Sequence, residues 1–273
     1  MWVTGHNVTY EVSEATGKIV RTIPTPGTDP EGCGAGIAAG AGAVWVTHFC
    51  QGVYRIDPHT GQVTASLRVP HAGNTIAVAD GLVWVADYQG TVLRIQPRTD
   101  RIVGKPIPVG YGDWTFAPHG GTLWVTNYGT PGIRPISRID LATGAVRRFG
   151  TPGVTDVQAV GAGSLWTSNV QRVNPATGEP TASIKMPRPS MVIFWKGYAW
   201  ALTEVPRSIR ILRIDPATNR VSGKPVTVDK PLSASKQLDS FDAAAGPSGL
   251  WVLDSSRGLL FHLALRPADR AVR

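Results

Sequence analysis

Two histidines are the residues of this chain best suited to acid–base chemistry. His71 lies in the stretch Pro70-His71-Ala72, and His48 ends an apolar stretch that begins at Ala43. Histidine titrates near neutral pH, so either residue could take or give a proton while a small molecule or cyclic peptide is cleaved. The sequence has no Gly-x-Ser-x-Gly segment, and no serine or cysteine is plainly paired with a base, so covalent catalysis has less support.

A larger set of polar and aromatic residues occupies equivalent places in a repeat, just after one predicted strand or just before another. The set is His48, Asn74, Asp87, Tyr88, Trp114, Asn127, Tyr128, Asp156, Asn169 and Asp254. Loops that vary on a repeated scaffold commonly carry a binding site, so we expect these residues to line a ligand-binding mouth. The alternative is that each Asp or Asn only closes a local turn through its side chain.

The two cysteines fall in links that we expect at the same mouth. Cys33 precedes the inner strand of the second repeat, and Cys50 follows the tryptophan strand of that repeat. A disulfide between them is geometrically plausible and would suit an oxidising compartment. The alternative is a reactive thiol at the mouth.

We expect no cofactor from the spacing of the metal-binding residue types. The histidines, cysteines and carboxylates do not fall at the short intervals of a zinc site. The weaker alternative is a divalent cation such as magnesium or calcium, held among Asp and Asn oxygens.

The elements that must position these residues are marked by tryptophan. Seven of the nine tryptophans recur about every 40 residues, a period typical of β-propellers. They are Trp2, Trp45, Trp84, Trp124, Trp166, Trp200 and Trp251. Each lies in an apolar strand. In several repeats, such as those of Trp45 and Trp84, this strand follows a strand of small residues, and turns such as Asp57-Pro58-His59-Thr60-Gly61 separate later strands.

This pattern predicts an all-β chain folded as a seven-bladed β-propeller of four-stranded antiparallel blades, with residues 1–273 as a single domain. The tryptophans should lie as wedges between neighbouring blades. A six-bladed ring with a spare N-terminal piece is the competing count. Met1 directly precedes Trp2, so the first blade lacks its inner strand. We expect that strand, and any signal or preceding domain, to lie upstream in a longer protein.

The chain is basic, with a net charge of +8 and a pI near 9.8. Its arginines are mostly single and spread over the repeats, which favours a solvated basic surface over a dedicated nucleic-acid stripe. No apolar run approaches the roughly 18 residues of a membrane span.

Phrases such as Val83-Trp84-Val85-Ala86-Asp87-Tyr88 and Trp124-Val125-Thr126-Asn127-Tyr128 resemble the YVTN repeat of YncE-like seven-bladed propellers. The resemblance covers essentially the whole chain and implies a secreted or periplasmic binding protein or a sensor module attached to a larger chain. More distantly the chain is similar to streptogramin (virginiamycin B) lyases, where Pro70-His71-Ala72 looks like the context of the first catalytic histidine. The Glu-Pro-His of that family is replaced here by Gly112-Asp113-Trp114.

These observations favour a non-enzymatic, monomeric propeller outside the cytoplasm. It would bind a small molecule, peptide or protein at one mouth of its central channel. The first alternative is a lyase-like enzyme that opens a cyclic peptide ester, with His71 and His48 as the catalytic candidates. The second is a single-stranded nucleic-acid binder that uses the basic charge.

Overall fold

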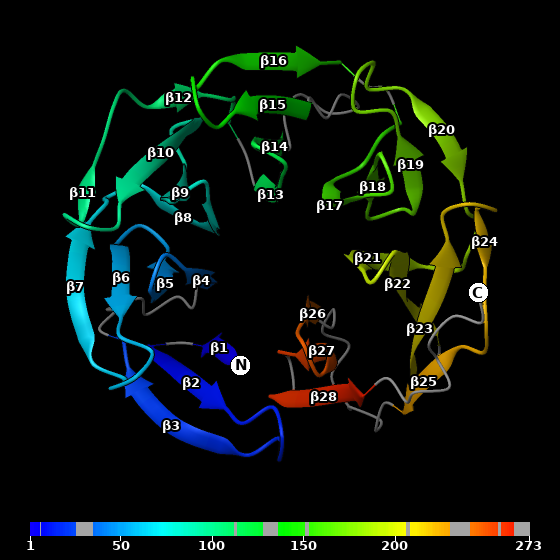
Figure 1. Ribbon diagram of the computed structural model, residues 1–273, viewed down its shortest axis with the longest axis horizontal. Helices are drawn as coiled ribbons and strands as arrows, with labels where there is room; N and C mark the ends of the chain where they lie inside the picture. The colour runs from blue at the N-terminus through cyan, green and yellow to red at the C-terminus, as the bar shows by residue number, and fades with distance from the viewer. Residues whose placement is uncertain are drawn as a thin grey trace. The chain divides into compact units, whose positions relative to one another are not determined.

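The computed structural model describes residues 1–5, 7–25, 35–111, 114–127, 136–150, 153–205, 208–229, 241–255 and 258–264. These residues form seven antiparallel sheets and no helix, and each sheet is one blade of a seven-bladed β-propeller (Figure 1). The predicted fold class is therefore confirmed. The chain divides into two compact units, Met1–Gly153 and Val154–Arg273. The prediction of a single domain stays a prediction.

The first unit holds blades 1 to 4, and each blade is built from consecutive strands. Blade 1 comprises β1 (Trp2–Gly5), β2 (Val8–Val12) and β3 (Ile19–Pro24). Blade 2 comprises β4 (Ala35–Gly40), β5 (Ala43–His48), β6 (Gly52–Ile56) and β7 (Val63–Arg68). Blade 3 comprises β8 (Ala72–Ala79), β9 (Leu82–Asp87) and β10 (Thr91–Gln96), with an outer strand split into β11 (Arg101–Ile102) and β12 (Ile107–Pro108). Blade 4 comprises β13 (Trp114–His119), β14 (Thr122–Asn127), β15 (Ile136–Asp140) and β16 (Val146–Phe149).

The second unit holds blades 5 to 7. Blade 5 comprises β17 (Val157–Gly161), β18 (Ser164–Thr167), β19 (Gln171–Val173) and β20 (Pro180–Ser183). Blade 6 comprises β21 (Pro189–Trp195), β22 (Tyr198–Val205) and β23 (Ser208–Asp215), with an outer strand split into β24 (Arg220–Val221) and β25 (Val226–Asp229). Blade 7 comprises β26 (Phe241–Ala245), β27 (Gly249–Asp254) and β28 (Leu259–Ala264). The sequence pattern predicts a short fourth strand of this blade at 271–273, which lies outside the described residues.

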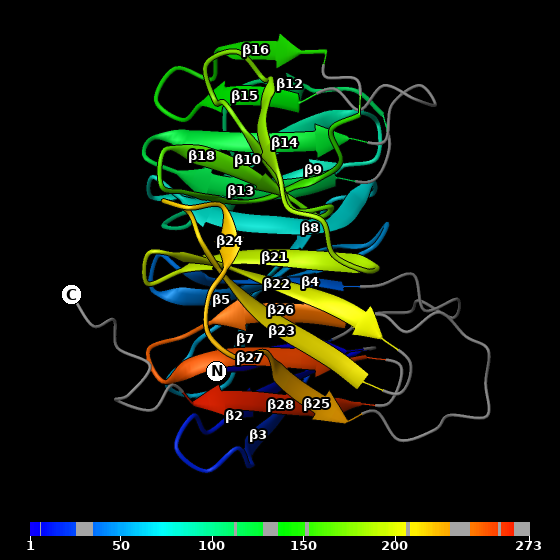
Figure 2. The ribbon, with the colours of Figure 1, turned by 90° about the vertical axis from the view of Figure 1, so that its right-hand side faces the viewer.

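We letter the strands of a full blade A to D from the inner edge outward, so that blade 1 has strands B, C and D. Within each unit the innermost strands of successive blades contact one another: β1, β4, β8 and β13 in the first, and β17, β21 and β26 in the second. Figure 2 shows β13, β8 and β4 of the first unit one above another. This approach is close, because a Cβ on Gly36 of β4 would lie 2.0 Å from the Asn74 carbonyl oxygen of β8. Glycine is therefore required there.

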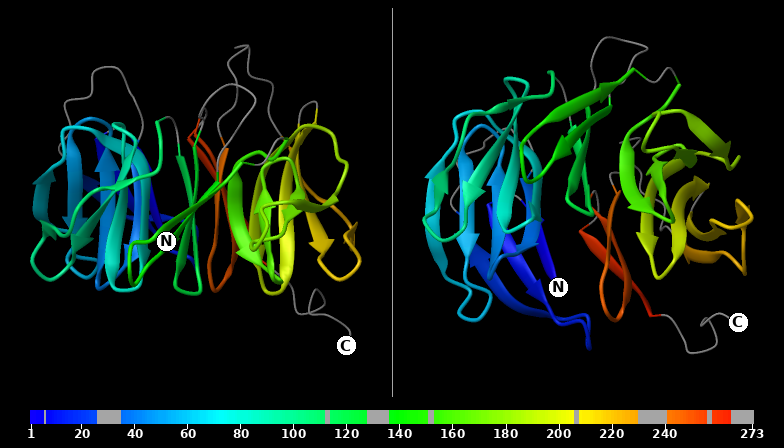
Figure 3. Two further views of the ribbon diagram at one scale, coloured as in Figure 1. Left: turned by 90° about the horizontal axis from the view of Figure 1, so that it is seen from above. Right: turned by 45° about the horizontal axis from the view of Figure 1, so that its top comes forward.

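Antiparallel order places the connections at two ends of each blade (Figure 3). We call the end with the B–C loops and D–A links the loop face, and the end with the A–B and C–D turns the turn face. Nothing in the described chain forms a helix long and apolar enough to cross a membrane.

The tryptophan of a B strand packs against the next blade of the same unit. Trp45 of blade 2 lies in one apolar cluster with Val83 and Leu93 of blade 3. Trp166 of blade 5 packs in the same way with Val192 and Ala201 of blade 6. Trp45 and Trp166 are fully buried, and an aromatic side chain removed from water at such a site contributes about 1.5–3 kcal/mol. The predicted wedge role is confirmed at these interfaces.

The residues opposite the tryptophans in the sheet repeat as well. On the A strand, five tryptophans face an alanine: Ala38, Ala77, Ala117, Ala159 and Ala244. On the C strand, five face an arginine: Arg55, Arg94, Arg138, Arg172 and Arg213. Glu11 takes this position in blade 1 and His262 in blade 7, where the His262 ring stacks on Trp251 at 3.9 Å.

Two of these arginines bridge to the C–D turn of the next blade. The Arg55 guanidinium lies 5.7 Å from the centre of the Trp45 ring and 3.3 Å from an Asp100 carboxylate oxygen of blade 3. Arg172 lies 5.4 Å from the centre of the Trp166 ring and donates a 2.8 Å hydrogen bond to Asn219 Oδ1 of blade 6. These bridging arginines stack on a tryptophan and bind the neighbouring turn, so part of the net charge is structural.

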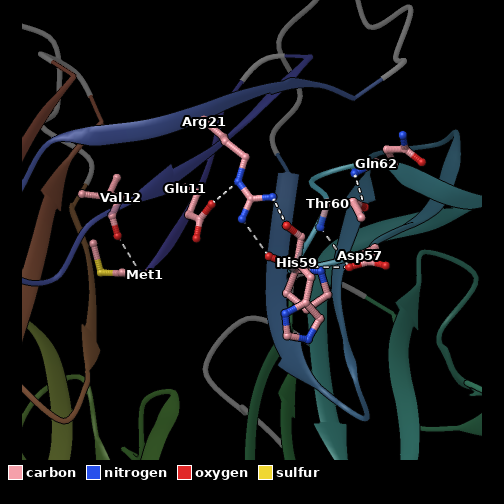
Figure 4. A network of polar contacts seen from close by, with 9 residues as sticks. Met1, Glu11, Val12, Arg21, Asp57, His59, Thr60 and Gln62 are labelled. Atoms are coloured by element: carbon pink, nitrogen blue, oxygen red, sulfur yellow. Dashed lines mark hydrogen bonds and ion pairs between the residues drawn. The ribbon is translucent and has the colours of Figure 1, made fainter.

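Blade 1 makes the same bridge with different residues. Arg21 pairs with Glu11 and donates hydrogen bonds to the carbonyl oxygens of Pro58 at 2.9 Å and His59 at 2.7 Å in the turn of blade 2 (Figure 4). Glu11, which lies opposite Trp2 where other blades have an arginine, thus orients Arg21 of the neighbouring strand β3.

The C–D turns are closed by carboxylates, as the sequence predicts. Asp57 Oδ1 accepts hydrogen bonds from the amides of His59 at 2.7 Å and Thr60 at 3.2 Å. Asp140 Oδ1 accepts from the Thr143 amide at 2.9 Å and from its hydroxyl at 2.8 Å. These hydrogen bonds favour the charged form and hold the pKa of both carboxyl groups below the usual value.

The bridging arginines predict a specific loss of stability. Replacing Arg172 by alanine should lower the free energy of unfolding by about 1.5–3 kcal/mol, because charge-assisted hydrogen bonds between blades are lost. Urea unfolding followed by tryptophan fluorescence measures this loss. Arg220→Ala, at an exposed position of β24, is the matched control and should change stability by less than about 0.5 kcal/mol. Equal losses in the two variants would contradict the bridging role.

The turn carboxylates predict a dependence of stability on pH. The folded-state pKa of Asp140 is lowered, so its stabilising contribution is complete above the unfolded value, near 3.8, and is lost as pH falls through the lowered folded value. Asp140→Asn should therefore destabilise the protein at pH 7 and lose that difference from wild type well below pH 4. Urea unfolding at a series of pH values tests this. If the difference in unfolding free energy between Asp140→Asn and wild type did not change with pH, the ionisation of Asp140 would not contribute to stability.

Candidate functional site

On the loop face of the first unit, the link between blades 2 and 3 is held between two B–C loops. The Cys50 amide donates to the Ala72 carbonyl oxygen at 2.8 Å, and the Tyr88 amide donates to the His71 carbonyl oxygen at 2.8 Å. The rings of Phe49 and Tyr88 meet edge to face with their centres 4.3 Å apart. Main-chain bonds and an aromatic contact therefore fix three loop segments against one another. We call Phe49, Cys50, His71, Asn74 and Tyr88 the rim.

Strand β8 is irregular where it enters the rim. Ala72 pairs with Asp87 and Ile76 with Val85, so Gly73, Asn74 and Thr75 lie opposite Ala86 alone. The extra residues form a bulge, a feature that redirects side chains and is frequent beside functional sites. The Asn74 side chain is exposed as a result.

The two candidate catalytic histidines have different surroundings. His71 is exposed on the rim, where its side chain can meet a ligand. His48 is 3% exposed, and its ring packs edge-on against Tyr54 with the centres 5.3 Å apart. The structure thus places the two imidazoles in unlike settings.

Two predicted mouth residues of the first unit are engaged in local structure. Asp87 Oδ1 accepts a 2.8 Å hydrogen bond from the Gln89 amide, which closes the B–C turn of blade 3. Asn127 is 1% exposed and donates from Nδ2 to the Val109 carbonyl oxygen at 2.7 Å, which holds the link between blades 3 and 4. For these two side chains the turn-closing alternative describes the observed contacts.

The predicted mouth residues of the second unit are also buried or bonded within local structure. Asn169 Oδ1 accepts hydrogen bonds from the hydroxyls of Thr155 at 2.7 Å and Thr167 at 2.6 Å. Asp156 is buried, and its carbonyl oxygen accepts from the Ser168 amide at 2.9 Å. Asp254 is buried at the end of β27, opposite Phe241.

Other predicted residues lie outside the described part of the chain. Cys33 and Tyr128 are among them, and for Trp114 only the backbone is described, paired with Asn127. The disulfide between Cys33 and Cys50 therefore stays a prediction. Within the described ranges, no three His, Cys, Asp or Glu side chains gather as a metal site.

Sequence reasoning missed Tyr111 as a surface residue. This side chain is 72% exposed in the link between blades 3 and 4, beside the B–C loop of blade 3, where Gly90 closely approaches Gly110 and Tyr111. The sequence feature that could have indicated its exposure is its position between two glycines, Gly110 and Gly112, in a D–A link.

No protein-family model matches this chain, and no curated protein matches it in sequence. A solved structure of Hsv2 from Kluyveromyces lactis, with a complete loop 6CD, is similar in fold with a TM-score of 0.62. The match covers 98% of this chain and 91% of that chain at 11% sequence identity. At this identity the likeness shows the fold alone.

The two asparagines provide a test of structural against surface roles. Asn127→Ala should lower the free energy of unfolding by about 1–3 kcal/mol, because the buried Val109 carbonyl oxygen loses its hydrogen bond. Asn74→Ala should change it by less than about 0.5 kcal/mol, since that side chain is exposed. Urea unfolding of the two variants gives both values. A larger loss in Asn74→Ala than in Asn127→Ala would reverse these assignments.

Proposed function

We propose that this chain is a non-enzymatic binding protein whose rim holds a peptide or protein partner. The observation that carries the proposal is the combination of fixed backbone and exposed side chains at the junction of blades 2 and 3. The amides of Cys50 and Tyr88 secure the link that carries His71 and Asn74, and these two side chains remain exposed. A surface already held in place loses little conformational entropy when it binds.

The composition of the rim supports a partner with little negative charge. The loop-face segments 48–51, 69–75, 87–90 and 109–111 contain no lysine or arginine, although the chain as a whole carries a net charge of +8. They supply Tyr88, Tyr111, Phe49 and the amide side chains of Asn74 and Gln89. Aromatic and amide side chains on loops are typical of surfaces that recognise proteins and peptides. A phosphate backbone would instead require basic side chains.

The enzymatic alternative rests on His71. His48 is buried against Tyr54 and is less accessible to a substrate. We retain an extracellular or periplasmic location, which the resemblance to YVTN-repeat propellers implies, and a monomeric state as parts of the proposal.

Selection from a library of random 12-residue peptides tests the proposal. The double variant His71→Ala/Asn74→Ala should bind the selected peptides at least tenfold more weakly than wild type, a loss of about 1.4 kcal/mol. The matched control is His59→Ala/Gln62→Ala, which changes two exposed residues of the turn face and should bind like wild type (Figure 4). Fluorescence polarisation gives the dissociation constants.

Two results would contradict the proposal. If no peptide is enriched, or if the selected peptides bind all three proteins equally, the rim is not the binding surface. If the protein opens a cyclic depsipeptide and His71→Ala abolishes that turnover, the protein is an enzyme.

A further inference from the structure

Three aromatic side chains follow one another over the loop ends of blades 2 and 3. Phe49 of one B–C loop meets Tyr88 of the next, with the ring centres 4.3 Å apart. Two residues beyond Tyr88, the Gly90 carbonyl oxygen accepts a 3.0 Å hydrogen bond from the Gly110 amide, which holds the link that carries Tyr111. Phe49 and Tyr88 are half-buried and Tyr111 is 72% exposed, so each is at least in part accessible to solvent.

Exposed hydrogen-bonding side chains lie beside these rings. His71 and Asn74 are exposed on the link that the Tyr88 amide holds, and Gln89 is exposed directly after Tyr88. A side-chain amide can donate two hydrogen bonds, and an imidazole can donate at least one. This part of the loop face therefore combines aromatic rings with donors for carbonyl oxygens.

The main chain of these loops is poorly suited to the addition of a strand. The amides of Cys50, Tyr88 and Gly110 are already bonded to carbonyl oxygens within the loop face. A peptide that adds to a sheet needs unpaired main-chain groups along an exposed strand edge. These loops consequently offer side chains for recognition.

The side chains present disfavour two other classes of peptide. An amphipathic helix needs an aliphatic groove, but segments 48–51, 69–75, 87–90 and 109–111 contain no leucine, isoleucine or methionine, and their two valines are buried. A phosphorylated or acidic peptide needs an arginine cluster, and the same four segments contain no lysine or arginine. Recognition of a polyproline II helix by aromatic side chains has neither requirement.

A polyproline II helix matches both features of this surface. It has no internal hydrogen bonds, so its carbonyl oxygens can accept from side chains such as those of Asn74 and Gln89. Its prolines pack against aromatic side chains. The helix is preformed and the loops are already fixed by main-chain bonds, so little conformational entropy is lost when the two associate.

The charge of this surface favours a basic residue in the peptide. The four segments contain one carboxylate, that of Asp87, and no lysine or arginine to balance it. Asp87 Oδ1 accepts a 2.8 Å hydrogen bond from the Gln89 amide, and the Asp87 side chain is half-buried beside the rings. A lysine or arginine next to the prolines would complement this charge.

We propose that the rim, together with Gln89 and Tyr111, binds a proline-rich segment of a partner in the polyproline II conformation, with a basic residue of the segment beside Asp87. This inference rests on the proposed function and names the class of peptide that the rim recognises. The aromatic rings contact the prolines, and the amide and imidazole side chains donate to the carbonyl oxygens of the segment.

A labelled probe peptide, acetyl-Lys-Pro-Pro-Ala-Pro-Pro-Ala-Pro-Pro-amide, tests the proposal beside a peptide in which every proline is alanine. Fluorescence polarisation should show saturable binding of the probe to the full chain. The alanine peptide should bind at least tenfold more weakly, because it lacks the proline rings and the preformed helix. The blocked ends of both peptides exclude capture of a free amine or carboxylate.

Two variants locate the binding on the protein. Tyr111→Ala should weaken binding of the probe at least tenfold, whereas Ile102→Ala, which changes an exposed apolar residue of β11 in the same blade, should bind like wild type. Asp87→Asn keeps an oxygen for the Gln89 amide and removes the charge. Wild type should prefer the probe to a form with glutamine in place of lysine by about two- to fivefold, as for an exposed ion pair, and Asp87→Asn should lose that preference.

Three results would overturn the proposal: no binding of the probe at millimolar concentration, equal binding of the probe and the alanine peptide, or binding that Tyr111→Ala leaves unchanged. If peptides from the random library lose affinity in His71→Ala/Asn74→Ala while the probe does not bind wild type, the proposed function stands and the class of peptide is wrong. If neither the probe nor any library peptide binds, both proposals fail.

Discussion

The packing of a tryptophan between an alanine and an arginine, found in blades 2 to 5, is the interaction on which the rest of this structure depends. The alanine on the inner strand leaves space for the indole, as Ala38 does for Trp45. The arginine on the third strand covers the indole and reaches the next blade, as Arg55 does toward Asp100. A single cross-strand row thus joins the packing inside a blade to the contact between blades.

In blades 2 and 3 the two ends of the blade differ in their chemistry. Bridging arginines and carboxylate-closed turns occupy the turn face, where Arg21, Arg55 and Arg172 bind neighbouring turns. The described loop-face segments of blades 2 to 4 carry no lysine or arginine. Part of the basic charge therefore serves the fold, and these loop-face segments of the first unit present aromatic, amide and imidazole side chains together with the Asp87 carboxylate.

The fold could be predicted from the sequence because its determinants are local and repeat. The strand containing Trp84 and the turn at Asp57 each carry their signal within a few residues, and a period near 40 residues multiplies that signal over the chain. The site was harder to predict. His48 and His71 were equivalent candidates in the sequence, yet one is buried against Tyr54 and the other is exposed. The burial of a histidine side chain depends on which loops come together in the fold, so it cannot be predicted from the sequence of one repeat.

The sequence by itself determined the all-β propeller class, the place of each tryptophan and the carboxylate-closed turns, and it favoured seven blades over six. Each of these follows from periodicity and strand order. Only the tertiary structure decided that Asn127 secures a link while Asn74 is exposed on a bulge, and that Phe49 meets Tyr88. It also showed the residues of β1 to be half-buried. The physical reason is that hydrogen-bond partners and solvent exposure are set by neighbours distant in the chain.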